Sequence, residues 1–279
     1  MSGRSASPGG GDGLLGGTRV ADLAGEPAVM AGRVLGDLGA DVVRVELPGG
    51  DPLARAEPHR FLAWSAGKRV LAVDGPDDPR LDELLATADV VIDTPGFPGA
   101  LVLDPARAPD AVWVSVTPFG RTGPRARWRA SDLGVMAASA NMYCTGDPDR
   151  PPVRCTERSA YAHVGPETAF AALTALAGGL PHRVDVSMQE VVFVANMSTP
   201  ARFPATGFRG RRRGANIGRT REIWPCVDGF VSFGLRGGKA RVKSLETLTR
   251  LVLADGIDAP ELAERDWGAF SHVTASDEE

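Results

Sequence analysis

Hydrophobic residues recur along this chain in two patterns, as short continuous runs and as longer segments with apolar residues at helical spacing. The runs typical of buried strands cover residues 18–24, 41–47, 68–74, 89–94 and 111–120. Helical spacing covers 26–40, 78–88 and 160–179, and one more strand and helix are expected over 182–197. Because parallel strands need crossover connections, this alternation favours a mostly parallel sheet with helices on both faces. The sequence therefore predicts an α/β fold.

The pattern changes after residue 198. Residues 199–222 contain proline, glycine and seven arginines without any periodicity, which is typical of a linker. A hairpin is expected over 223–235, and two short helical patterns follow it. The predicted organisation is a flexible tail over 1–17, a large α/β domain over 18–198, the linker over 199–222, and a small α+β domain over 223–279. The last residues form no obvious closing element, so we expect the small domain to be incomplete.

Composition narrows the class of protein. With 279 residues, 43% of them hydrophobic, the chain can bury a core without disulfides or metals. The net charge of −4 gives no argument for nucleic acid or an anionic membrane as a partner, and no apolar run is long enough to cross a bilayer. Cys144, Cys155 and Cys226 are widely spaced and form no metal or disulfide pattern. We expect a cytoplasmic protein that binds no metal, nucleic acid or membrane.

The segment GDGLLG, beginning at Gly11, formally matches the GxGxxG pattern of dinucleotide-binding loops. That loop must follow a strand, because its glycines turn the chain into the helix whose N-terminus meets the pyrophosphate. Here the glycines precede the first predicted strand. We therefore interpret them as part of the flexible tail.

Local motifs exclude several enzyme classes and leave basic residues as candidates for binding. The sequence contains no GxSxG, HExxH or P-loop pattern, which disfavours serine hydrolases, metalloproteases and P-loop kinases. The four histidines stand alone, at His59, His163, His182 and His272. Arginine suits phosphate oxygens, and the basic candidates for a phosphorylated small molecule are Lys68, Arg69, Arg121, Arg125, Arg127 and Arg129. The alternative interpretation is that these basic residues are solvated side chains on the protein surface and bind no ligand.

Several longer motifs resemble the class III CoA-transferases, a family that includes formyl-CoA transferase, carnitine CoA-transferase and α-methylacyl-CoA racemase. They include VADLAGEPAVMAGRVLGDLGADVVRVELPGGDP, GKRVLAVD, VSVTPFGRTGP, SDLGVMAASANMYCTGDPDRPPVR and VDVSMQE. The resemblance runs from about Thr18 to the end of the chain, and its most specific part is Gly36 to Glu46 with the PGGDP that follows. It implies a large Rossmann-like domain, a small domain and two interlocked chains.

The resemblance also implies that coenzyme A, as an acyl-CoA substrate, binds along the large domain. The basic residue of the GKR motif corresponds to Lys68, with Arg69 beside it, and the basic position before the SDL motif corresponds to Arg129. One family position that is arginine in formyl-CoA transferase is Leu47 here.

The catalytic groups of the family are absent from the matching positions. The nucleophilic aspartate of the transferases corresponds to Tyr161, and the histidine of the racemase corresponds to Ser131. An aspartate forms a mixed anhydride with the acyl group, whereas a phenol with a pKa near 10 is about 0.1% ionised at pH 7 and cannot form one. Glu157 replaces the carboxylate only if the helix starts early, and His163 falls on nearly the opposite helix face.

The same absence occurs in family enzymes that pair two homologous subunits, such as benzylsuccinate CoA-transferase, in which one subunit lacks the nucleophile. The resemblance therefore implies a non-nucleophilic subunit of a heteromeric CoA-transferase, with a partner that carries the aspartate. Family chains continue beyond the DWGAF segment, so the resemblance implies either that a separate polypeptide supplies the missing part or that the chain has lost it and changed function. Two alternatives stay open: a non-enzymatic CoA-binding or scaffold protein, and a diverged acyl-CoA lyase or hydratase.

Overall fold

A computed structural model describes residues 13–271, except for residues 155, 180, 218–219 and 235–236. The chain divides into two compact units. The first unit comprises Met1–Tyr143 and Arg154–Arg209, and the second comprises Cys144–Val153 and Gly210–Glu279. Cys155, His272 and the first residues of the predicted tail lie outside the described residues. The described end of that tail forms a turn, in which Leu15 packs against the core.

The first unit is built on a six-stranded sheet in the order β3-β2-β1-β4-β5-β6. Its strands are β1 (Arg19–Asp22), β2 (Asp41–Glu46), β3 (Arg69–Ala72), β4 (Val90–Asp93), β5 (Val112–Thr117) and β6 (Arg183–Ser187). Every neighbouring pair is parallel. The predicted α/β fold with a mostly parallel sheet is therefore confirmed.

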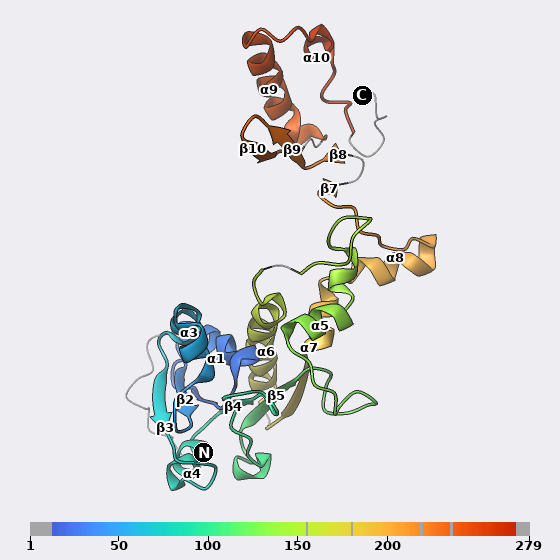
Figure 1. The fold of residues 1–279 in the computed structure, drawn as a ribbon. Helices are drawn as coiled ribbons and strands as arrows, with labels where there is room; N and C mark the ends of the chain where they lie inside the picture. Colours follow the sequence, from blue (N-terminus) through green and yellow to red (C-terminus); the bar gives the residue numbers. More distant parts are fainter. Residues whose placement is uncertain (1–12, 155, 180, 218–219, 235–236, 272–279) are drawn as a thin grey trace. The chain divides into compact units, whose positions relative to one another are not determined.

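Helices cover both faces of this sheet. The helices of the first unit are α1 (Val29–Asp37), α2 (Pro52–Ala56), α3 (Pro58–Ser65), α4 (Pro79–Leu85), α5 (Asp132–Ala138), α6 (Ser159–Ala177), α7 (Met188–Val194) and α8 (Ser198–Thr206). Short 3-10 turns span Glu26–Ala28 and Pro105–Arg107. In Figure 1, α1 and α6 lie against one face of the sheet and α4 lies at the opposite face. No helix in the described ranges is long and apolar enough to cross a membrane.

Alternate residues of each strand point to different faces of the sheet, so each strand contributes side chains to two hydrophobic cores. On β5, Val112, Val114 and Val116 pack in the cluster that contains α1 and α6 residues. Trp113, between them, packs in the second cluster with Leu81 of α4. Because both faces of the sheet are covered, the central strands are continuous apolar runs, and this is the reason that the sequence pattern identified them.

The second unit contains a two-stranded antiparallel hairpin and short helices. Strand β9 (Ile223–Cys226) pairs with β10 (Gly229–Ser232), as the sequence predicts. The other elements are β7 (Asn216–Ile217), β8 (Thr220–Arg221), a 3-10 turn (Lys239–Arg241), α9 (Val242–Ala254) and α10 (Pro260–Glu264). The segment before α6 joins this unit, where the Gly214 amide donates to the Gly146 carbonyl at 2.9 Å.

The segment 199–222, predicted as an irregular linker, contains regular structure. Its first residues belong to α8, which ends at Thr206 and is followed by Gly207 in the left-handed conformation. The arginines and prolines of this segment conceal the helix, because Pro204 within it interrupts the helical pattern. A linker role for the remaining residues stays a prediction.

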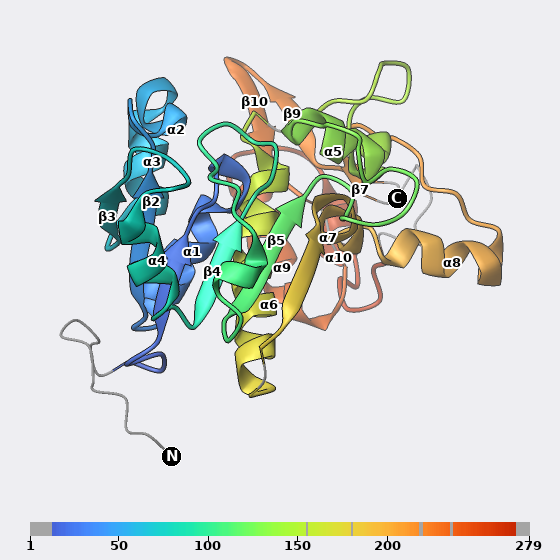
Figure 2. The same ribbon diagram turned by 90° about the horizontal axis from the view of Figure 1, so that it is seen from below.

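The strand order reverses between β1 and β4, which lie side by side although β2 and β3 separate them in sequence (Figure 2). The loops that leave these two strands contact each other at their start, where the Gly25 amide donates to Thr94 Oγ1 at 2.7 Å. A Cβ on Gly25 would stand 2.5 Å from the Pro98 carbonyl oxygen, so the loops approach too closely for a side chain. In open α/β sheets, ligands bind at such a reversal, outside the carboxyl ends of the strands.

Replacing Gly165 of α6 by alanine is expected to destabilise the first unit by about 1–3 kcal/mol, because the new methyl group overpacks the α1–α6 contact. Its Cβ would lie 2.6 Å from Met30 Cβ. Gly36→Ala in α1 is the matched control, since its Cβ would meet only Val42 at an ordinary 3.6 Å. Urea unfolding of the two variants measures the difference, and equal midpoints would show that the contact tolerates a side chain.

Candidate functional site

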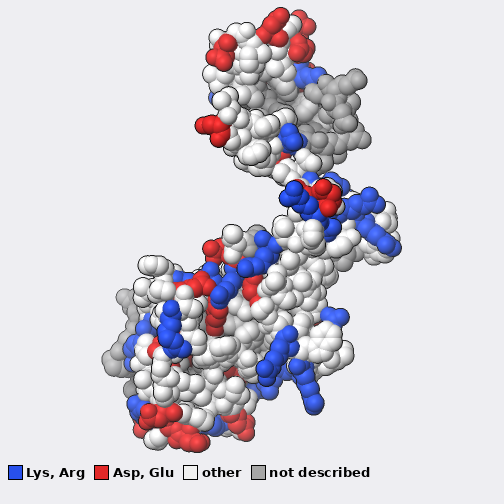
Figure 3. Space-filling model, viewed as in Figure 1, with Lys and Arg blue, Asp and Glu red and all other residues white. Residues whose placement is uncertain are grey.

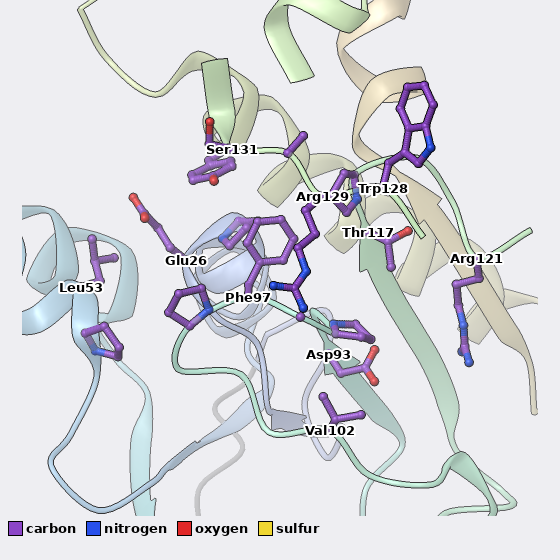
Figure 4. A pocket seen from close by; sticks show the side chains of 18 of the residues that line it. Glu26, Leu53, Asp93, Phe97, Val102, Thr117, Arg121, Trp128, Arg129 and Ser131 are labelled. Carbon is purple, nitrogen blue, oxygen red and sulfur yellow. The ribbon is translucent and has the colours of Figure 1, made fainter. Parts of the chain in front are cut away.

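A cavity of about 840 Å³ opens at the carboxyl ends of β1, β2, β4 and β5, at the reversal of strand order (Figure 4). We call it the central cavity. Its walls come from the loop after β1, the loop after β4, the end of β5, the segment before α5 and the start of α6. All of these elements belong to the first unit. The position is the one that the parallel topology favours for a ligand.

Tyr161 lies in the first turn of α6 and lines the central cavity with 6% of its surface exposed. Its hydroxyl oxygen accepts a hydrogen bond from the Asp132 amide at 3.2 Å. The ring packs edge-on against Phe97, with the ring centres 6.3 Å apart. Burial, with the nearby Glu26 carboxylate, raises the pKa of Tyr161 to about 12. The phenol is therefore protonated at neutral pH.

Asp132 fixes the entry of α6. Its Oδ1 accepts from the Ala160 amide at 2.8 Å and from the Tyr161 amide at 3.3 Å, so a carboxylate occupies the positive end of that helix. Ser131, the preceding residue, stands at the N-cap position of α5 without a side-chain capping bond and lines the central cavity. The SDL motif thus brings Ser131 and Tyr161 to the same wall.

Four arginines line the central cavity, namely Arg121, Arg127, Arg129 and Arg158. Arg158 pairs with Glu26 and with Glu57, and Arg121 donates to Ser115 Oγ at 3.2 Å. Arg129 points into the cavity in Figure 4. Within the described part of the chain, no ion pair engages Arg127 or Arg129. Two uncommitted guanidinium groups suit a ligand with several phosphate oxygens.

Lys68 does not line the central cavity. Its side chain is 1% exposed, and Nζ donates to Asp22 Oδ2 at 2.8 Å and to the Val29 carbonyl. Asp22 also pairs with the buried Arg44 at 3.3 Å, and Arg44 in turn pairs with Asp51. Burial raises the pKa of Asp22, but the two cations outweigh it and hold the carboxylate ionised. Lys68 therefore belongs to a buried charge network beneath the cavity.

Arg69 is the other predicted coenzyme contact that lies away from the central cavity. Its side chain is 63% exposed on β3 and donates to Asp41 at 2.8 Å. Leu47, at the position that is arginine in formyl-CoA transferase, packs against the second core cluster. The structure brings together Arg129, Ser131 and Tyr161, whereas coenzyme A contacts by Lys68 or Arg69 stay predictions.

The two residues weighed as replacements for a nucleophile lie outside the central cavity. The Glu157 carboxylate is exposed before the start of α6 and pairs with Arg60 at 2.6 Å. His163 is exposed, two residues after the buried Tyr161. Charged residues of both signs interleave over α3 and the start of α6, as Figure 3 shows. Neither side chain is positioned to act in place of an aspartate at position 161.

Sequence reasoning missed three acidic residues in the central cavity, Glu26, Asp51 and Asp93. Asp51 is committed to its pair with the buried Arg44. Glu26 follows β1 and pairs with Arg158 and, at 3.5 Å, with Arg60. Burial raises the pKa of Glu26 despite these arginines. Asp93 ends β4 and is 2% exposed. The positions of Glu26 and Asp93 at the carboxyl ends of two predicted strands were the available signal, because those strand ends meet at one edge of the sheet.

The stability of the protein is expected to fall above about pH 10 relative to a Tyr161→Phe variant. Unfolding releases Tyr161 from a pKa of about 12 to one near 10, so the unfolded state loses its proton first. The raised pKa therefore contributes fully below pH 10, and its contribution is lost as the pH rises to about 12. Parallel thermal melts at pH 8, 10 and 11 test this, and a constant difference across that range would contradict it.

Three comparisons with known proteins agree on a family. The model of CoA-transferase family III matches residues 15–266. The BbsE subunit of succinyl-CoA:(R)-benzylsuccinate CoA-transferase from Thauera aromatica is 31% identical over 93% of this chain and 69% of its own length. A succinate–glutarate CoA-transferase from Agrobacterium fabrum is 30% identical over 78% of this chain and 62% of its own. The probable CoA-transferase Rv1866 of Mycobacterium tuberculosis is 33% identical over 73% of this chain, which spans 29% of it.

Solved structures lead to the same family. A CAIB/BAIF family protein from Brucella suis matches with a TM-score of 0.73 and 25% identity, over 94% of this chain and 74% of that one. Rv3272 of Mycobacterium tuberculosis matches with a TM-score of 0.70 and 26% identity, over 91% and 72%. The parallel sheet, the central cavity and these matches are consistent with one another. The chain belongs to CoA-transferase family III.

Proposed function

We propose that this chain is a non-nucleophilic subunit of a heteromeric class III CoA-transferase. It binds and shapes the acyl-CoA site, while a homologous partner chain supplies the aspartate that takes up the acyl group. The observation that carries the proposal is Tyr161, a protonated phenol that occupies the wall of the central cavity where the resemblance places the nucleophile.

The size and charge of the central cavity support an acyl-CoA ligand. Its volume of about 840 Å³ is within the range of small-molecule and cofactor sites. Arg127 and Arg129 offer forks of donors for phosphate oxygens, and they are not committed to a described acidic partner. Proline, valine and leucine side chains line the rest and suit an uncharged chain. The thioester end would lie toward Tyr161.

The chemistry of Tyr161 limits what the chain does alone. An ionised carboxylate attacks a thioester carbonyl and leaves as part of an anhydride, whereas a protonated phenol at neutral pH does neither. The Tyr161 oxygen accepts from the Asp132 amide, which leaves its proton available to donate to a ligand. We assign Tyr161 to orienting the acyl group rather than to covalent catalysis.

Glu26, a carboxylate that lines the central cavity together with Tyr161, is a weak replacement for the nucleophile. Arg158 and Arg60 hold the Glu26 oxygens in ion pairs. Ion pairs stabilise the negative charge that a carboxylate gives up when it attacks a thioester. They also hold the Glu26 oxygens on the arginines, so these oxygens are not free to attack a thioester carbonyl. We therefore place the acyl-accepting group on another chain.

The name of one relative supports a heteromeric assembly. BbsE is described as a subunit of a CoA-transferase, and this chain aligns with 69% of it. We propose an interlocked assembly of this chain with a homologous partner. The two thiols in the described residues, Cys144 and Cys226, are free, and they support the expected cytoplasmic location.

Co-expression with a homologous chain that carries the aspartate tests the proposal. The expected result is that the two chains co-elute in gel filtration, and that only the pair transfers coenzyme A from succinyl-CoA to a dicarboxylic acid. Tyr161→Phe, which keeps the ring but loses the hydroxyl, is expected to slow the pair only about 2- to 10-fold, the loss of one hydrogen bond, while asparagine in place of the partner's aspartate abolishes the transfer. If the chain is a stable, inactive monomer that binds no such homologue, the result would favour a scaffold protein instead.

A further inference from the structure

Trp128 offers an exposed aromatic ring to the central cavity, which it lines. Its surface is 60% exposed, whereas Trp113 is 1% exposed in the core. The structure describes all five tryptophans of the chain, and the remaining three are half-buried, namely Trp64, Trp224 and Trp267. Trp128 is thus the most exposed of the five. An indole has a flat apolar face on which a flat group of a ligand can stack.

Two neighbours hold the Trp128 ring in place. Phe119, which follows the end of β5 by two residues, meets the ring edge-on with the ring centres 6.0 Å apart. The Arg125 guanidinium lies over the ring at 5.5 Å from its centre, and Arg125 does not itself line the cavity. A side chain that already has a fixed orientation loses little conformational entropy when a ligand stacks on it. The ring is therefore prepared for binding before a ligand arrives.

Arginines stand on both sides of Trp128 in the sequence. Arg127 and Arg129 line the same cavity, and no ion pair engages them within the described residues. Consecutive Cα atoms are about 3.8 Å apart, so one short segment supplies a ring and two guanidinium groups. Proteins bind nucleotides in this way, with the base stacked on an aromatic ring and the phosphates on cations. A nucleotide fits the segment because one ribose joins its base to its phosphates.

An aromatic acyl group is the other flat group that could stack on Trp128. Such a group lies at the thioester end of the ligand, which we place toward Tyr161, and it carries no phosphate for the arginines. In Figure 4, Trp128 lies apart from Ser131, which shares the wall of Tyr161, and Arg129 lies between them. The place of Trp128 beside the arginines and away from that wall favours the base of a nucleotide.

We propose that Trp128 is the stacking platform for the adenine ring of coenzyme A, with Arg127 and Arg129 binding the phosphates next to that ring. The inference rests on the proposed function, because it assigns the nucleotide end of the acyl-CoA ligand to one segment of the central cavity. The platform gives the chain a means to select CoA thioesters over pantetheine thioesters of the same acid, which lack the adenine and its phosphates.

Titration calorimetry of the full chain with coenzyme A, 3′,5′-ADP and pantetheine tests the platform. Trp128→Leu, which keeps an apolar side chain but removes the ring, is expected to weaken binding of coenzyme A and of 3′,5′-ADP about 5- to 50-fold. The affinity for pantetheine is expected to stay within about twofold. Trp128→Phe, which keeps an aromatic ring, is expected to recover most of the loss. Binding of 3′,5′-ADP should quench the tryptophan fluorescence of wild type, and this quenching should be lost in Trp128→Leu.

Phe170→Leu is the matched control for the loss of an exposed ring. Phe170 lies on α6, is 63% exposed and does not line the cavity, so its replacement should leave all three affinities within about twofold of wild type. Equal affinities of wild type and Trp128→Leu for 3′,5′-ADP would overturn the platform and leave the proposed function standing. An equally large loss for pantetheine would also overturn it, because pantetheine has no base to stack. If wild type binds neither coenzyme A nor 3′,5′-ADP, both the proposed function and the platform fail.

Discussion

Lys68→Met is expected to destabilise the first unit by about 3–5 kcal/mol, because it leaves Asp22 buried without its strongest partner. Asp22 is fully buried and accepts from Lys68 at 2.8 Å. Arg44 lies 3.3 Å from the same carboxylate but also pairs with Asp51. It therefore neutralises the charge of Asp22 only in part when Lys68 is absent. Chemical denaturation at neutral pH, followed by circular dichroism, measures the loss.

Arg69→Ala is the control for this experiment. Arg69 follows Lys68 directly and pairs with Asp41 at the surface, so its removal is expected to cost no more than about 1 kcal/mol. The comparison separates two roles that the sequence could not distinguish. If Lys68→Met keeps the stability of wild type but loses affinity for coenzyme A, then Lys68 contacts the ligand and does not stabilise the fold through Asp22.

Arg129→Ala is expected to weaken coenzyme A binding about 10- to 100-fold, the loss of one charge-assisted phosphate contact. Arg129 lines the central cavity and points into it. Because Arg129 is engaged by no described acidic side chain, its removal should leave the melting temperature unchanged. Calorimetric titration at a fixed ionic strength gives the affinity. A higher salt concentration should reduce the difference in coenzyme A affinity between wild type and variant, because salt screens the charge of Arg129.

Arg125→Ala is the matched control for Arg129. It removes the same charge from the same segment, but Arg125 faces Gln189 and Trp128 and does not line the cavity. Its affinity for coenzyme A is expected to stay within about twofold of wild type. Equal losses in both variants would mean that the segment acts through its total charge rather than through a defined contact.

The fold was predictable from the sequence where local pattern and burial agree. Strands β1, β4 and β5 are buried on both faces and therefore read as continuous apolar runs. Helices α2 and α3 had no such signal. The short α2 buries only Leu53, and α3 has no fully buried residue, so neither shows a clear apolar stripe. Helix α8 was not predicted because Pro204 within it interrupts the helical pattern.

The site was predictable only through the family resemblance, and then only in part. Arg129, Ser131 and Tyr161 match family positions, and they do meet at one cavity. Lys68 matches as well, but its burial depends on Asp22, which lies 46 residues earlier in the sequence. A local pattern cannot reveal such a partner. Asp93 was missed because an acidic residue after a strand gains meaning only when the neighbouring strand ends are known.

The measurement that tests the central claim most directly is intact-mass spectrometry of the purified chain after incubation with succinyl-CoA, beside calorimetry of the same sample. We predict that the chain binds coenzyme A and its thioester, yet carries no acyl or CoA adduct and transfers nothing by itself. With the homologous partner present, the adduct should appear on the partner's aspartate alone. An adduct that maps to Tyr161 or Glu26 of this chain, or transfer by the chain alone, would contradict the account.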